Sequence, residues 1–145
     1  MLSQLTYGAI LIGLTVVIHA VCLELIIRAW RAVSIEVEVR WRAISLSLTI
    51  IGIFAAHIVE IWIWAIFYFF VEEIQNWESA LYFSTSSFTT VGYGDLVLSE
   101  EWRLLGSIEA INGMILFGWS TAFIFAGVRR IYGHLYRGEE PHLAS

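Results

Sequence analysis

The chain has 145 residues, of which 59% are hydrophobic and 14% are charged, and its mean hydropathy is +0.75. This composition is typical of a membrane protein of one domain and excludes a water-soluble globular fold. The formal net charge of −5 argues against a nucleic-acid partner, and a single cysteine excludes an internal disulfide.

The first apolar run covers about residues 5–27. At about 1.5 Å per residue, a helix of this length crosses a hydrocarbon core of about 30 Å. Near its end, Glu24 can pair with Arg28 one turn later. His19 lies deeper, where an ionisable group is expected to face protein or water. Two interpretations of His19 stay open: a neutral, hydrogen-bonded helix contact or a proton-sensing group.

A charged linker follows at residues 28–42, and its local structure is ambiguous. Residues 35–42 alternate between apolar and charged, which on periodicity alone indicates a strand. The pairs Glu36–Arg40 and Glu38–Arg42, however, have the spacing and order that stabilise a helix. We favour a short amphipathic helix that leads into the second span, and the choice between helix and strand stays open.

The second span is predicted at residues 43–70 and ends in an aromatic-rich segment, as expected near a membrane interface. His57 and Glu60 are three residues apart and therefore lie on one helix face. Both are at membrane depth, so we expect them to face protein. They form either a buried hydrogen-bonded pair that ties this helix to a neighbour or a pH-sensitive gating element.

A short polar link at residues 71–78 precedes a segment, residues 81–88, that is too short to cross the membrane. This segment is predicted to be a re-entrant helix that begins near residues 76–79, because its serines and threonines are too polar to face lipid. The C-terminal end of such a helix carries a partial negative charge, which favours a cation in front of it.

The next residues, Thr89–Asp95, read TTVGYGD. Gly92 and Gly94 reach positive φ without steric cost, so the backbone can change hand at alternate residues. Such a backbone can aim successive carbonyl groups to one side. Four copies around an axis would form stacked rings of oxygens, which can replace the water shell of a potassium ion.

Together with the short helix before it and the apolar helix after it, TTVGYGD resembles the signature of tetrameric potassium channels over about residues 43–128. The resemblance implies K⁺ ions in the filter and no other cofactor. It implies ion-binding positions at Thr90, Val91, Gly92 and Tyr93. It also implies residues that support the filter: Thr89, Gly94, Asp95, Tyr82 and Ser86.

The chain departs from this family where many relatives have two tryptophans that brace the filter. The matching positions are Tyr82 and Phe83, and Ser86 stands where some relatives carry an acid. Phe83 has no donor for the Tyr93 hydroxyl, whereas Tyr82 can still donate to Asp95. We therefore expect a different and weaker brace, with conductance that drifts when external potassium is depleted.

The third span is predicted at residues 102–128 and corresponds to the pore-lining helix of the family. Gly113 lies where the family often has a hinge, although a packing role is equally open. Glu109 and Asn112 form a polar pair that either bonds to the short helix from behind or attracts ions in the cavity. The candidates for lining the inner cavity are Ile115, Gly118, Ala122 and Ala126.

The fold class predicted is an all-α membrane protein with three transmembrane helices, a re-entrant pore helix and a filter, assembled as a homotetramer because one pore segment needs four copies. Residues 1–42 are an extra helix and linker, residues 43–128 the pore domain, and residues 129–145 a short polar tail. No auxiliary subunit is identifiable, and the partners expected are other copies and lipid.

Orientation follows from the arginines, since seven of eight lie in the linker or the tail. Positive residues stay cytoplasmic, which places the N-terminus and the filter outside. The outer segments are acidic and would concentrate cations at the pore mouth. A prokaryotic inner membrane is the expected location.

The resulting functional prediction is a passive potassium-selective channel and not an enzyme. Arg28 and Arg31 are too few for a voltage sensor, so we expect weak voltage dependence. Two alternatives are a subunit of a potassium uptake transporter and a non-conducting structural or regulatory subunit. The stimulus that opens the pore (protons, membrane tension or none) and the role of the first helix stay open.

Overall fold

The computed structural model describes residues 2–32 and 39–136. It contains four helices over these ranges: α1 (Leu2–Ala32), α2 (Val39–Phe70), α3 (Trp77–Phe88) and α4 (Arg103–Tyr136). Among the described residues there is no strand. Three helices are long and apolar enough to cross a membrane, with candidate spans at Leu2–Arg31, Trp41–Phe70 and Arg103–Arg130. The predicted all-α membrane fold is therefore confirmed at the level of the single chain.

The linker prediction is tested only at its end. Residues 39–42 are helical and form the first turn of α2, while residues 33–38 lie outside the described part of the chain. The expected pair of Glu24 and Arg28 is present, with 2.9 Å between Glu24 Oε1 and Arg28 Nε, on an exposed face of α1.

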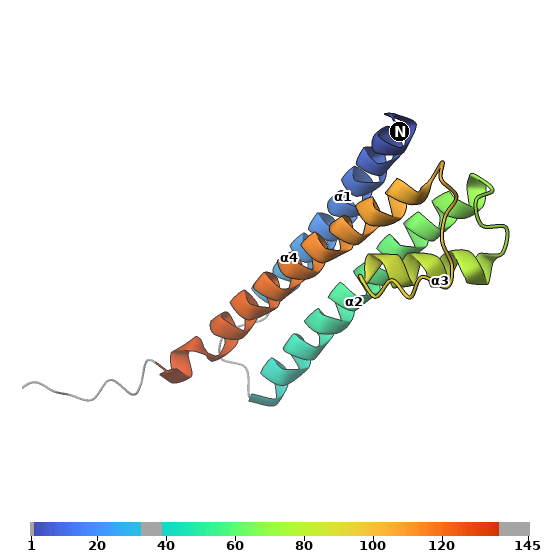
Figure 1. The fold of residues 1–145 in the computed structure, drawn as a ribbon. Coiled ribbons are helices and arrows are strands. Elements are labelled where there is room, and N and C mark those ends of the chain that lie inside the picture. Colours follow the sequence, from blue (N-terminus) through green and yellow to red (C-terminus); the bar gives the residue numbers. More distant parts are fainter. Residues whose placement is uncertain (1, 33–38, 137–145) are drawn as a thin grey trace, which may run out of the picture.

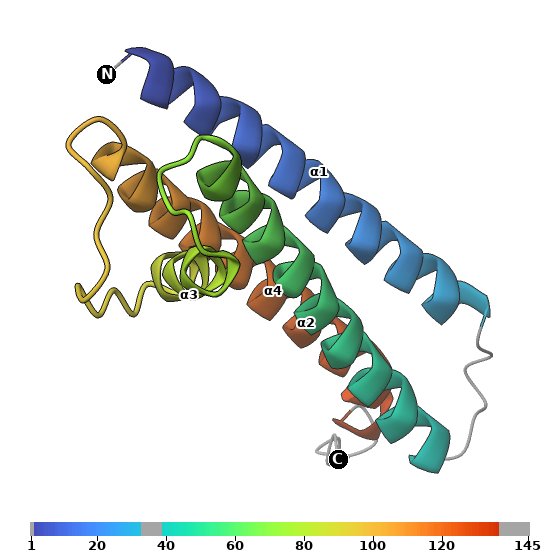
Figure 2. The same cartoon turned by 90° about the vertical axis from the view of Figure 1, so that its right-hand side faces the viewer.

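The three long helices run side by side, and the short α3 packs against the side of α2 and α4 (Figures 1 and 2). Among the described helices, α3 contacts α2 and α4 but not α1, whereas α1 contacts α2 and α4. The chain reverses direction between α1 and α2, and the segment at residues 89–95 runs back beside α3, while the link from there to α4 reaches the end where α1 begins (Figure 1). The first helix therefore packs against α2 and α4 without touching α3.

The core sits where α3 meets α2 and α4. Its largest fully buried apolar side chains are Trp64, Tyr68, Phe88, Leu105 and Leu116. The outer faces of the long helices instead expose large apolar side chains, such as Leu14, Val21 and Phe54. Exposed apolar surface on this scale is unfavourable in water and is satisfied by lipid or by other chains.

Two glycines let α1 and α4 approach each other closely. A Cβ on Gly8 would lie 3.0 Å from Ile108 Cγ2, and a Cβ on Gly127 would overlap the indole ring of Trp30. Trp30 also stacks on Phe123, with ring centroids 5.0 Å apart, and donates from Nε1 to Thr49 Oγ1 of α2 at 2.9 Å. The first helix is thus packed against the rest of the chain near both of its ends.

Candidate functional site

The short helix α3 begins and ends with polar caps. The side-chain oxygen of Asn76 accepts a hydrogen bond from Ser79 N at 3.2 Å, which satisfies one of the free N–H groups at the start of the helix. At the other end, Thr89 N donates to Thr85 O at 3.1 Å and Thr90 N donates to Ser87 O at 2.9 Å. The chain leaves the helix directly into the TTVGYGD segment.

The backbone of this segment changes hand at every second residue. The φ angles are +62° at Thr90, +54° at Gly92 and +75° at Gly94. The two glycines adopt this region without cost, as their positions in the sequence indicated, whereas Thr90 is β-branched and rarely adopts it. Strain at a β-branched residue persists only where the surroundings hold it, and it is concentrated at functional sites.

Ser86 of α3 connects the helix to the TTVGYGD segment through two further hydrogen bonds. Gly92 N donates to Ser86 O at 3.1 Å, and Tyr93 N donates to Ser86 Oγ at 3.4 Å. Ser86 therefore contacts the segment through both its main chain and its side chain. The position where some relatives carry an acid is here a direct support of the glycine-containing backbone.

The C-terminal end of the segment is held by Tyr82 and Asp95. The Tyr82 hydroxyl donates to Asp95 Oδ2 at 2.7 Å, and the two tyrosine rings of Tyr82 and Tyr93 stack with centroids 6.3 Å apart. The hydrogen bond from Tyr82 lowers the pKa of Asp95, and the same bond raises the pKa of Tyr82. Phe83 makes no such bond and packs edge-on against Tyr68.

The segment is not enclosed by its own chain. Val91 is 52% exposed and Tyr93 is 71% exposed, and the other residues from Thr90 to Asp95 are exposed as well. An open cavity of about 220 Å³ borders the segment and is lined by residues that include Phe83, Ser86 and Gly94. A dehydrated ion would need oxygens from further copies, and the ion-binding assignments stay predictions.

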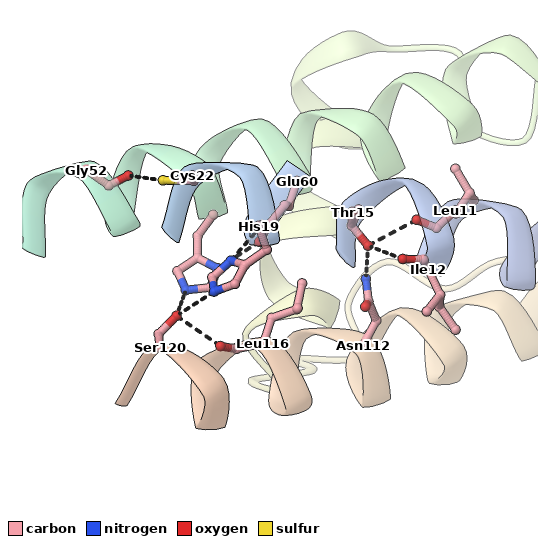
Figure 3. Close-up of polar contacts among 11 residues, drawn as sticks. Leu11, Ile12, Thr15, His19, Cys22, Gly52, Glu60, Asn112, Leu116 and Ser120 are labelled. Carbon is pink, nitrogen blue, oxygen red and sulfur yellow. Dashed lines mark hydrogen bonds and ion pairs between the residues drawn. The ribbon is translucent and has the colours of Figure 1, made fainter. Parts of the chain in front are cut away.

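Behind α3, Glu109 of α4 joins all three elements of the core. Its carboxylate accepts from the Ser84 hydroxyl at 2.5 Å and from the Tyr68 hydroxyl at 2.8 Å, and the residue is completely buried. Asn112, which spacing pairs with Glu109, instead donates to Thr15 Oγ1 of α1 at 2.8 Å (Figure 3). This partner has no local signal in the sequence, because Thr15 is 97 residues away.

Gly113 lies where α4 crosses the end of α3. A Cβ at this position would overlap the Phe88 carbonyl oxygen, so only glycine permits this approach. A Cβ on Gly118, in contrast, would point into open space, with no neighbouring atom within 4 Å. The packing interpretation of Gly113 has a direct structural basis, and its role as a hinge stays a prediction.

The four residues expected to line the inner cavity share one face of α4. Ile115, Gly118, Ala122 and Ala126 are all exposed in the single chain. The buried residues of the helix, among them Glu109, Leu116 and Ser120, lie on the opposite side. The face is available to a cavity or to other copies, and the lining role stays a prediction.

His19, His57 and Glu60 meet between α1 and α2. His19 Nδ1 lies 2.9 Å from Glu60 Oε1, and His57 Nδ1 lies 2.8 Å from Glu60 Oε2. The other ring nitrogens both face Ser120 Oγ of α4, at 3.2 Å for His19 and 3.0 Å for His57. Figure 3 shows His19, Glu60 and Ser120 converging from three helices. The sequence predicted neither the part of Ser120 nor the meeting of the two histidines, because a serine in an apolar helix does not by itself indicate a polar cluster.

Comparison with known proteins identifies a family and a partial relative. A family model described as "Ion channel" matches residues 54–130. The calcium-gated potassium channel TvoK of Thermoplasma volcanium is 40% identical over 55 residues, which is 37% of this chain and 16% of that protein. The chain thus matches only about a sixth of the relative's length. No solved structure matches the chain.

Proposed function

Because this chain belongs to the ion channel family, we propose that four copies assemble around an axis into a potassium-selective pore. The observation that carries the proposal is the alternation of positive φ at Thr90, Gly92 and Gly94 within TTVGYGD. Alternating backbone hands can turn successive carbonyl groups to one side, where fourfold rings of oxygen replace the hydration shell of K⁺. The partial match to a potassium channel supports the same ion.

Each part of the segment has its own role in this proposal. The carbonyl groups of Thr90, Val91, Gly92 and Tyr93 bind the ions, with the Thr90 hydroxyl at the inner end. Thr89, Ser86, Tyr82 and Asp95 hold the segment, and Gly94 permits its geometry. The exposure of Thr90, Val91, Gly92 and Tyr93 in one chain fits a site that is completed only by the other three copies.

The two ends of the proposed pore differ in charge. The loops and helix starts near the filter carry the acidic residues Glu72, Glu73, Glu78, Asp95, Glu100 and Glu101 and one basic residue, Arg103. Four copies of these loops would concentrate cations at the mouth, less so at high salt. The other arginines of the described residues lie toward the opposite ends of the long helices, which we assign to the cytoplasm of a prokaryotic cell. The inner cavity is assigned to the exposed face of α4 that contains Ile115, Gly118, Ala122 and Ala126.

Single-channel recording from the purified chain in a planar bilayer tests this function. Discrete K⁺ currents are expected from the wild-type chain, together with a tetramer by native mass spectrometry. A Gly92→Ala variant would be strained at φ +54° and is expected to abolish the current. A non-conducting subunit would give no current from either chain. A transporter subunit would give no single-channel steps, even as a stable oligomer.

A further inference from the structure

The polar cluster between α1, α2 and α4 has the composition of a metal site. Among the described residues, His19, His57 and Glu60 place one ligand atom each within 4.8 Å of one another. The three residues are buried, with exposed fractions of 0%, 6% and 0%. Such groups are expensive at membrane depth unless each is paired. The proposed pore function uses none of them.

We propose that His19, His57 and Glu60 bind a structural divalent transition-metal ion, with Zn²⁺ as the best-fitting one. The Nδ1 atoms of the two rings face different oxygens of the Glu60 carboxylate, at 2.9 and 2.8 Å. A cation that replaces the Nδ1 protons takes a position bounded by two nitrogens and a carboxylate. The remaining coordination position is filled by the second Glu60 oxygen or by a water molecule.

Ser120 fits the support that metal-bound histidines require. A ligating histidine donates its other ring N–H to an oxygen, and this bond fixes the ring orientation. Both Nε2 atoms face Ser120 Oγ, at 3.2 Å from His19 and 3.0 Å from His57. The Ser120 hydroxyl itself donates to the Leu116 carbonyl at 2.9 Å, so its oxygen is free to accept from both rings. With a metal ion bound to both Nδ1 atoms, every ring nitrogen of the two histidines therefore has a partner.

The ligand set selects the class of metal. Two imidazoles and one carboxylate suit zinc and neighbouring transition metals, whereas magnesium and calcium prefer oxygen ligands alone. Aromatic rings pack against the cluster: the His19 ring lies 5.3 Å from the Trp119 ring, and the His57 ring lies 4.6 Å from the Phe117 ring, centroid to centroid. Cys22 is not a ligand here, because its thiol donates to the Gly52 carbonyl at 3.6 Å.

The consequence is a cross-link between the extra helix and the pore unit. His19 belongs to α1, His57 and Glu60 to α2, and the supporting Ser120 to α4. A buried ion at this point ties α1 to its neighbours without taking part in ion conduction. The inference is independent of the proposed function, since zinc content and current are separate measurements.

Metal content of the 145-residue chain, purified in lipid nanodiscs, tests the site. The protein is incubated with ZnSO₄, dialysed against buffer with a weak chelator and analysed by plasma mass spectrometry. We expect about one zinc per wild-type chain and nearly none in His19→Gln or His57→Gln, which lack a ligand nitrogen. The matched control is Thr15→Val, which breaks a buried α1–α4 hydrogen bond of 2.8 Å and leaves the ligands untouched; it should keep its zinc.

Two further measurements separate metal binding from a general effect on folding. Wild-type protein loaded with Co²⁺ should show visible absorption bands that Zn²⁺ displaces, and Ser120→Ala should weaken zinc affinity by about 10- to 100-fold. Wild-type protein without zinc would overturn the proposal and leave a cluster held by hydrogen bonds alone. Retention of about one zinc per chain in both histidine variants would overturn it equally.

Discussion

Glu109 of α4 and Ser84 of α3 are joined by a completely buried hydrogen bond of 2.5 Å, which fixes the pore helix from behind. The second oxygen of Glu109 accepts from Tyr68 of α2 at 2.8 Å. Ser84 Oγ also lies 2.8 Å from the Ile61 carbonyl oxygen of α2. One carboxyl group therefore connects the three helices that position the filter.

Removal of the Glu109 carboxyl group should destabilise the fold, whereas an amide at the same position should preserve most of its hydrogen bonds. In Glu109→Ala, the Ser84 and Tyr68 hydroxyls lose a buried partner, and we expect a loss of about 1–3 kcal/mol in the free energy of unfolding. In Glu109→Gln, the amide can donate to Ser84 and accept from Tyr68, so the loss should stay below about 1 kcal/mol. Thermal unfolding in detergent measures both. Equal destabilisation by the two substitutions would show that the hydrogen bonds do not hold α3.

Gly113 and Gly118 offer a matched pair on one helix. A methyl group at Gly113 overlaps the Phe88 carbonyl oxygen, so Gly113→Ala should cost about 1–3 kcal/mol through overpacking. In Gly118→Ala the new methyl group points into open space, so this variant should be neutral or stabilising by up to about 1 kcal/mol. Thermal unfolding distinguishes the two. If Gly113→Ala left stability unchanged but altered open probability, Gly113 would be a hinge and not a packing residue.

The contact between Tyr82 and Asp95 should make the outer end of the filter sensitive to acid. The pKa of Asp95 is lowered by the Tyr82 hydrogen bond, so this stabilisation is present at neutral pH and is lost as the pH falls through the folded-state pKa. In Tyr82→Phe the pKa of Asp95 should rise toward its ordinary value. A carboxyl-carbon NMR titration of Asp95 checks this shift, and an unchanged titration curve would contradict it.

The same substitution should also affect conduction. With the hydroxyl removed, currents should decline faster after depletion of external potassium, because one support of the segment is lost. Tyr7→Phe is the control, since Tyr7 lies on α1 and contacts Phe67 through its ring. Identical decline in wild type and Tyr82→Phe would contradict a bracing role for this bond.

Voltage should have little effect on opening. Arg28 lies near the end of α1 and pairs with Glu24 on an exposed face, and a steep response needs several charges that move through the membrane field. We expect a shallow conductance–voltage relation in symmetrical potassium. A steep relation would contradict this and would require gating charges elsewhere.

The elements of the fold were predictable because each has a local signal. Long apolar runs marked α1, α2 and α4, and a short polar segment before two glycines marked α3. The predicted spans marked the apolar stretches and not the helix ends: α1 begins at Leu2, before the apolar run at about residue 5, and α2 begins at Val39, inside the linker where the sequence favoured a short helix. Charged and polar residues extend the helices beyond the apolar core, and hydropathy does not detect them.

Long-range contacts were only partly predictable. Spacing placed His57 beside Glu60, but only packing brings His19 and Ser120 to the same point. The positive φ of Thr90 has no local sequence signal, because a β-branched residue disfavours it. The ion-binding positions stay predictions, since a single chain contains only a quarter of the proposed site.

The reversal potential of the purified chain under bi-ionic conditions tests the central claim most directly. With K⁺ on one side of the bilayer and Na⁺ on the other, carbonyl rings fitted to dehydrated K⁺ predict a reversal potential far from zero, in the direction of K⁺ selectivity. A reversal potential near zero would show that sodium passes as readily as potassium and would contradict the account.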